Sequence, residues 1–245
     1  MRITWLGHSS VLLETGAARL LTDPLLRRRV AHLLRHGPAP PDPGPVDGVL
    51  LSHVHRDHLD RPSLRSLARP QTIAVVPRGA GRLLRRMAFG AVRQVRAGDV
   101  VTIAGASVRA VPAWHEARRR PGAATVDALG YLVDRVWFAG DTGVDPAMAE
   151  LNGEVDVALV PVWGWGPTLG PGHMDPAEAA RAIALVAPAI AVPIHWGTFL
   201  PAGLRGRHED LLTEPPLRFA AEVASVAPAT RVVTLAPGEA LEPFG

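Results

Sequence analysis

Three histidines and one aspartate lie within six positions near the end of the first quarter of the chain. His53, His55, Asp57 and His58 directly follow 46–51, an apolar run that predicts a buried strand. Neutral imidazole and carboxylate are ligands of zinc and similar divalent metals. Alternate side chains of an extended segment share a face, so His53 and His55 can bind one ion together, and Asp57 and His58 can turn toward a second. A polar loop is the alternative, but a buried strand end is a costly place for four unsatisfied titratable groups.

The spacing His53-x-His55-x-Asp57-His58 resembles the metal signature of the metallo-β-lactamase fold superfamily of hydrolases. Three further candidate ligands occur in the family's order, each at the end of a predicted strand: His115, Asp141 and His195. The resemblance runs from about Arg2 to Leu235. It implies two metal positions, the first held by His53, His55 and His115, the second by Asp57, His58 and His195, with Asp141 bridging both.

The resemblance also implies a reaction. Zinc is the expected ion at both positions, and manganese, iron or nickel would also suit nitrogen and oxygen ligands. Two such ions can share a hydroxide of near-neutral pKa, which would serve as the nucleophile. Asp57 and His173 are the predicted catalytic residues. His173 precedes a predicted helix, where a histidine can donate to a phosphate or protonate a leaving group; a loop histidine packed on Trp163 or Trp165 is the alternative.

Further motifs are similar to one branch of the superfamily, which contains N-acyl-phosphatidylethanolamine phospholipase D and L-ascorbate-6-phosphate lactonase. They span 5–14, 22–24, 138–143, 173–179 and 195–199. The branch implies a small phosphodiester, ester or lactone substrate. A nuclease of the same fold and a metal-binding protein without turnover are the alternatives.

Further residues are candidates for supporting roles. His8 and Asp23 can orient the ligands, although turn roles explain them equally well. The cluster Arg118, Arg119 and Arg120 can bind an anionic substrate, or it forms a solvated loop. Trp163 and Trp165 can form an apolar wall of the pocket, or they pack in the core. His32, His36 and His208 fall outside the pattern and are expected on the surface.

The remaining chain predicts the elements that must position these residues. Short apolar runs at 2–6, 11–14 and 19–22 indicate a β-meander, and later strands alternate with helices expected at 62–68, 79–88, 145–151, 175–186 and 217–224. With the resemblance, this order predicts an α/β fold, the four-layer αββα sandwich, as one domain over 1–245. The segment 27–45 begins like a basic amphipathic helix and ends in a Pro/Gly-rich string, which favours a surface excursion over a flap.

The composition of the chain indicates its compartment and the class of its partners. The chain has no cysteine, which excludes disulfides and thiolate metal sites and fits a reducing cytoplasm. No apolar stretch approaches the ~20 residues that cross a bilayer, and 1–5 lacks the plan of a signal peptide. The net charge is +3 and all 26 basic residues are arginine. These arginines are scattered and do not form a stripe, which argues against a nucleic-acid partner and for a small-molecule substrate.

Overall fold

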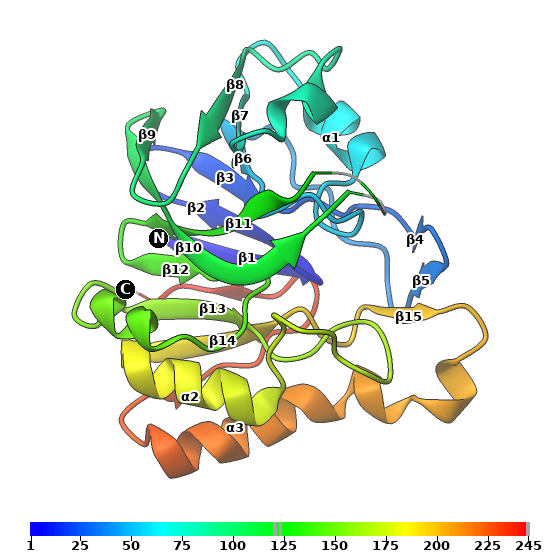
Figure 1. Ribbon diagram of the computed structural model, residues 1–245, viewed down its shortest axis with the longest axis vertical. Coiled ribbons are helices and arrows are strands. Elements are labelled where there is room, and N and C mark those ends of the chain that lie inside the picture. The colour runs from blue at the N-terminus through cyan, green and yellow to red at the C-terminus, as the bar shows by residue number, and fades with distance from the viewer. Residues whose placement is uncertain (120–121, 123, 244–245) are drawn as a thin grey trace.

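The computed structural model describes residues 1–119, 122 and 124–243. These residues form two seven-stranded sheets that pack face to face, with helices on both outer faces (Figure 1). A third, small sheet lies beside them.

The first sheet has the order β17-β1-β2-β3-β6-β7-β8. Pairing is antiparallel from β17 to β3 and parallel from β3 to β8. The sequence predicted neither β8 nor β17. The bounds are β1 (Arg2–Gly7), β2 (Ser10–Glu14), β3 (Arg19–Thr22), β6 (Gly48–Leu50), β7 (Ile73–Pro77), β8 (Ala91–Val95) and β17 (Ala240–Leu241).

The second sheet repeats this plan in the order β16-β14-β13-β12-β11-β10-β9. Pairing is antiparallel from β9 to β12 and parallel from β12 to β16. Consequently β1, β3 and β6 share one direction in their sheet, as do β10, β12 and β14 in theirs. The bounds are β9 (Val100–Ile103), β10 (Ala106–Ala117), β11 (Val126–Val133), β12 (Val136–Phe138), β13 (Val157–Pro161), β14 (Ile190–Ile194) and β16 (Arg231–Val232).

Three apolar clusters hold the layers together. The central one joins the two sheets and includes the fully buried Trp5, Tyr131 and Phe138. Each such aromatic contributes about 1.5–3 kcal/mol through burial. The second joins the second sheet to α2 (Pro176–Val186) and α3 (Glu214–Val226), and the third joins the first sheet to α1 (Arg61–Leu67). The predicted α/β sandwich is confirmed, with layers in the order helix, sheet, sheet, helix.

Two helices begin at side-chain caps. The Asp60 carboxylate accepts a hydrogen bond from the Ser63 N–H at the start of α1. Asp175 and Glu178 form the reciprocal capping box at the start of α2. The helix predicted over 79–88 is instead a 3₁₀ turn, Gly81–Leu84, and that predicted near 145–151 is also 3₁₀, Pro146–Leu151. Shorter 3₁₀ turns span Arg205–Arg207 and Asp210–Leu212.

The helix expected to begin at Arg27 is wrong. The chain forms a hairpin of β4 (Arg29–Val30) and β5 (Leu33–Arg35), which pairs with β15 (Phe199–Pro201) in the third sheet. The reason is distant in sequence. Arg35 is buried, and its guanidinium donates to the carbonyl oxygens of Leu6, Leu25 and Arg27, contacts that the hairpin provides.

Among the described residues, no helix has the length and apolar character that a membrane crossing requires.

Candidate metal centre

The candidate ligands follow the carboxyl ends of strands that share a direction within each sheet. In the first sheet, His8 follows β1, Asp23 follows β3, and the stretch His53 to His58 follows β6. In the second, His115 lies near the end of β10, Asp141 follows β12, and His195 follows β14. Their side chains meet at one edge of the sandwich, in four overlapping clusters among the described residues. Two clusters that share no residue are called the first and second group below; the other two place Asp23 with His53 and His58, and Asp141 with His115 and His173.

The first group is His53, His55 and His115. The Nδ1 atom of His55 lies 3.0 Å from Nε2 of His53 and 3.1 Å from Nε2 of His115. A β-bulge in β10 aims His115 at the group, because the register with β11 shifts between Ala113 and Ala117. Bulges re-aim side chains next to active sites.

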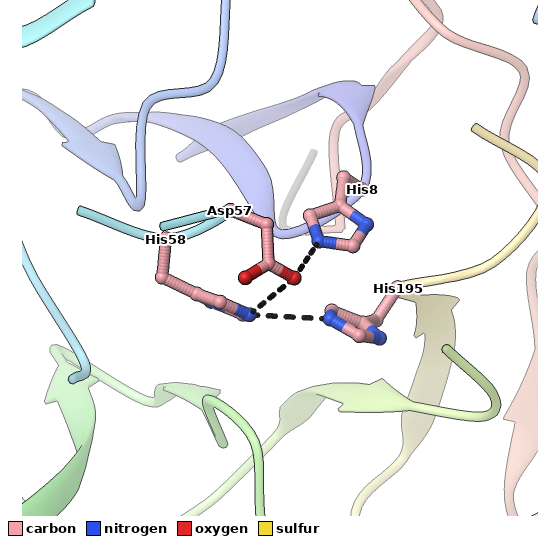
Figure 2. Close-up of side chains that lie close together, drawn as sticks. All are labelled: His8, Asp57, His58 and His195. Atoms are coloured by element: carbon pink, nitrogen blue, oxygen red, sulfur yellow. Dashed lines mark hydrogen bonds and ion pairs between the residues drawn. The ribbon is translucent and has the colours of Figure 1, made fainter. Parts of the chain in front are cut away.

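The second group is His58, His195, Asp57 and His8. Figure 2 shows the Asp57 carboxylate between His8 and His58, with His195 facing His58. The Nε2 atoms of His58 and His195 are 3.2 Å apart, and Oδ2 of Asp57 lies 3.1 Å from Nε2 of His8. The His8 ring packs on the His195 ring with centroids 4.0 Å apart.

Two of these histidines have strained backbones. His8 and His195 have φ of 53° and 60°, in the left-handed region that L-residues rarely adopt. The two backbones hold each other, because the His195 N–H donates to the His8 carbonyl oxygen at 3.0 Å. The His8 N–H also donates to Oγ1 of Thr198. Strain that is held in place in this way is concentrated at functional sites.

Asp141 lies between the two groups. Its Oδ2 atom is 3.1 Å from Nε2 of His58 and 3.9 Å from Nε2 of His53, and its Oδ1 atom is 3.3 Å from Nε2 of His195. Oδ1 is buried and accepts no hydrogen bond within the described part of the chain. A buried carboxylate oxygen without a donor has an unmet need for a cation.

Outer hydrogen bonds set the tautomers of the imidazoles. Nδ1 of His58 donates to the Asp23 carboxylate at 2.8 Å, that of His115 to the Gly172 carbonyl at 3.0 Å, and that of His195 to the Trp163 carbonyl at 2.9 Å. The Ser52 hydroxyl donates to Asp23 and therefore accepts from Nδ1 of His53. These acceptors take hydrogen bonds only, so in the neutral rings every Nε2 atom is a lone pair aimed at the site.

This arrangement fits a metal pair. The Nε2 lone pairs of His58 and His195 face each other, and a single Nδ1 hydrogen on His55 cannot serve both His53 and His115. A cation in each group would satisfy all these donor atoms, and the outer partners are those that orient metal-binding histidines. The ligand set of imidazole and carboxylate suits zinc.

The electrostatics keep most of these ligands in the state that binds a metal. Burial lowers the pKa of His55 to about 4 and that of His195 to about 3, and lowers the pKa of His53 well below its usual range. Burial alone would raise the pKa of Asp141, but His195 and His58 outweigh it and hold that pKa well below normal. Burial also lowers the pKa of His58, yet Asp141 and Asp57 outweigh it and raise that pKa well above normal. A proton on His58 and a bound cation would each supply positive charge beside the carboxylates of Asp57 and Asp141.

The other predicted residues are placed as follows. Asp23 is buried and accepts hydrogen bonds from Ser52 and His58, and its carboxylate lies close to the ring nitrogens of His53 and His58. Nε2 of His173 lies 3.5 Å from Oδ2 of Asp141 at the open side of the site. Arg118 is exposed and pairs with Glu116. Trp163 contributes its carbonyl to His195, and its ring nitrogen donates to the Gly166 carbonyl.

A cavity of about 290 Å³ opens onto both groups, lined by His55, Asp57, Asp141 and His173. Its other walls include Arg56, Arg119, Trp165 and His32. Arg119 belongs to the predicted cluster 118–120, and Trp165 belongs to the pair predicted as an apolar wall, whereas Arg56 and His32 were not predicted at the site. Arg120 itself lies outside the described residues.

The chain is similar to known proteins over most of its length. The profile of the family described as "Beta-lactamase superfamily domain" matches residues 18–196. A UPF0173 metal-dependent hydrolase from Methanopyrus kandleri is 32% identical over 258 aligned positions, covering 99% of this chain and 100% of the relative. A relative with the same description from Archaeoglobus fulgidus is 30% identical and covers 99% of each chain.

Among solved structures, Igni18, a metallo hydrolase from Ignicoccus hospitalis, superposes with a TM-score of 0.71 at 21% identity, covering 98% of this chain and 97% of that one. CmlA, a diiron β-hydroxylase from Streptomyces venezuelae, superposes with a TM-score of 0.71 at 18% identity over 98% of this chain and 53% of that one. At these identities the likeness concerns the fold alone, and a shared fold does not fix the reaction.

Proposed function

Because this chain belongs to the β-lactamase superfamily, among its UPF0173 metal-dependent hydrolases, we propose that it hydrolyses a small ester, lactone or phosphodiester at a site for two divalent ions. The observation that carries the proposal is the pair of ligand groups joined by Asp141. The first would hold one ion through His53, His55 and His115, and the second would hold another through Asp57, His58 and His195. Zinc is the proposed ion.

A bound metal pair would supply an activated water and neutralise the negative charge that develops during hydrolysis. The chain's own residues supply position and protons. His8 donates a hydrogen bond to Oδ2 of Asp57 and thereby orients that carboxylate at the cavity floor. Aiming a group before the reaction begins removes the cost of reorganising it later.

His173 is the proposed general acid. Its Nδ1 atom donates to the Gly170 carbonyl, which directs Nε2 toward Asp141 and the cavity. Burial lowers the pKa of His173, but Asp141 outweighs it and raises that pKa above normal. A proton held at Nε2 can pass to the leaving oxygen, so that one water is consumed and one acid and one alcohol are released.

The motifs shared with the phospholipase D and lactonase branch support ester or phosphodiester cleavage. The absence of cysteine supports a cytoplasmic setting, and a single domain is proposed for 1–245.

The test combines metal content with turnover. Purified protein loaded with zinc should contain two equivalents per chain by elemental analysis. It should hydrolyse at least one of bis-p-nitrophenyl phosphate, a lactone panel or β-lactams. Asp141→Ala should lose hydrolysis and weaken both metal equivalents, since Asp141 contacts both groups. Retained turnover in this variant would refute the assignment, and inactivity on every substrate with two ions bound would favour a metal-binding protein without turnover.

A further inference from the structure

The cavity above the metal centre has one cationic wall. Arg56 and Arg119 line it, next to His55 and Asp57 of the floor. Nη1 of Arg119 donates to the carbonyl oxygens of Val54, His55 and Leu59, at 3.1, 3.4 and 2.8 Å. These bonds fix the guanidinium beside the cavity, and they neutralise none of its charge because carbonyl groups are uncharged.

The charges of Arg56 and Arg119 are not directly paired. Neither arginine has a carboxylate within 4.0 Å in the described part of the chain. The nearby Asp60 is occupied, because Arg27 holds both of its oxygens at 2.9 and 2.7 Å. Burial lowers the pKa of Arg119 and repulsion from Arg56 and Arg61 lowers it further, whereas Asp60 and Asp57 oppose this from longer range. Two neighbouring guanidinium groups without a directly paired carboxylate favour an anion that binds both of them.

Another part of the cavity lining is apolar and aromatic. Val30 and Leu33, from the β4–β5 hairpin, line the cavity together with Trp165. The His32 ring meets the Trp165 ring edge-on at 5.2 Å. The volume of about 290 Å³ lies at the small end for ligand cavities. The space therefore suits a short hydrocarbon segment that reaches from the metal face to the cationic wall.

We propose that the substrate is a small organic anion that carries a carboxylate or phosphate group separate from the bond that is cleaved. Arg56 and Arg119 bind that group, and the hydrocarbon segment lies against Trp165 and Leu33. The scissile bond then lies over Asp57, Asp141 and His173. The inference rests on the proposed hydrolytic function and adds the chemical class of the substrate. Planar guanidinium groups match both anions in geometry, and pairing with a charged group is stronger than pairing with a neutral one.

The first experiment compares two esters with the same leaving group. Mono-4-nitrophenyl glutarate carries a free carboxylate, and 4-nitrophenyl butyrate does not. The ratio of their kcat/KM values should favour glutarate by about tenfold or more in the zinc-loaded protein. Arg56→Gln should reduce that ratio to near one. The matched control is Arg118→Gln, which removes an equal charge nearby from an exposed arginine paired with Glu116 and should leave the ratio unchanged.

The second experiment measures binding without turnover. Titration calorimetry with glutarate should give a Kd about tenfold higher in Arg56→Gln than in wild type, and a parallel titration with methylphosphonate tells a carboxylate preference from a phosphate preference. Arg119→Lys keeps the positive charge but loses the planar guanidinium group that can bind two oxygens at once. The zinc content of this variant shows whether residues 53–59, whose carbonyl oxygens Arg119 binds, keep their metal-binding arrangement.

The outcomes separate the two proposals. If neither ester is hydrolysed but glutarate binding depends on Arg56, the proposed hydrolysis of esters fails and the anion site stands. If both esters are hydrolysed at a ratio that Arg56→Gln does not change, the anion site is overturned and the hydrolase stands. Glutarate binding that is the same in wild type and in both arginine variants also overturns the anion site.

Discussion

Asp23 supports both metal groups through one buried carboxylate, and its replacement by asparagine is the most informative perturbation. Oδ1 accepts from the Ser52 N–H at 2.7 Å, and Oδ2 accepts from the Ser52 hydroxyl and from Nδ1 of His58 at 2.8 Å. Ser52 in turn accepts from Nδ1 of His53. Asp23 thus orients His58 directly and His53 through Ser52, one ligand in each group.

An asparagine cannot meet all three demands. If its oxygen takes the place of Oδ2, its NH₂ faces the Ser52 N–H, and that buried donor is left unpaired. If the amide is reversed, the NH₂ faces Nδ1 of His58, and the ring must move its proton to Nε2, which removes the lone pair aimed at the site. An unpaired buried donor costs about 1–3 kcal/mol, and a hydrogen bond to a charged group contributes a similar amount. The metal-free Asp23→Asn protein should therefore be about 2–4 kcal/mol less stable.

The loss of these hydrogen bonds in Asp23→Asn should also lower the affinity for metal ions. Loss of an outer partner typically weakens metal affinity by about 10–100-fold, and here both equivalents should weaken because both groups are supported. The assays are urea unfolding of the metal-free protein at pH 7.5 and zinc titration against a competing chelator. Asp156→Asn, which breaks an exposed pair with Arg135, is the control and should change stability by no more than about 1 kcal/mol. Wild-type stability together with two wild-type metal affinities in Asp23→Asn would refute the reasoning.

Two further results are expected. His8→Asn should weaken one metal equivalent by about tenfold and spare the other, because His8 lies against Asp57, His58 and His195, which all belong to the second group. Asparagine is chosen because it tolerates the φ of 53°. Equal loss of both equivalents in the chelator titration would contradict this. The metal-free protein should lose stability as the pH falls from 6.5 toward 4, as measured by urea midpoints. In that window the unfolded chain protonates the histidines corresponding to His55 and His195, while the folded chain, with pKa values of about 4 and about 3, does not. The raised pKa of His58 acts above this window, because its contribution to stability is already fully present below about pH 6.5. A urea midpoint that rises as the pH falls from 6.5 toward 4 would contradict the prediction.

The convergence of the candidate ligands could be predicted because each of them follows a short apolar run, a local pattern visible in the sequence. Strand ends in one direction gather at one edge, so residues as far apart as His53 and His195 meet without any local signal linking them. The hairpin at Arg29–Arg35 could not be predicted in this way. Its arginine and leucine spacing also fits a helix, and the deciding partners, β15 and the carbonyls around Arg35, lie elsewhere in the sequence.

The cavity walls were harder to predict than its floor. Whether Arg118 or Arg119 faces the ligands depends on the bulge in β10, which changes the side toward which each following residue points. Trp163 and Trp165 differ for a similar reason, since the chain turns between them and only Trp165 reaches the β4–β5 hairpin.

Each ligand group draws its members from both halves of the chain. His53 and His55 come from one sheet and His115 from the other, and the same division separates His58 from His195. An ion bound there would link the two sheets. It would stabilise the folded state by about 4 kcal/mol at a free ion concentration a thousand times its Kd. Metal scarcity would then loosen the junction between the halves at that rim first, so the same ions that equip the protein for chemistry would govern how long it survives.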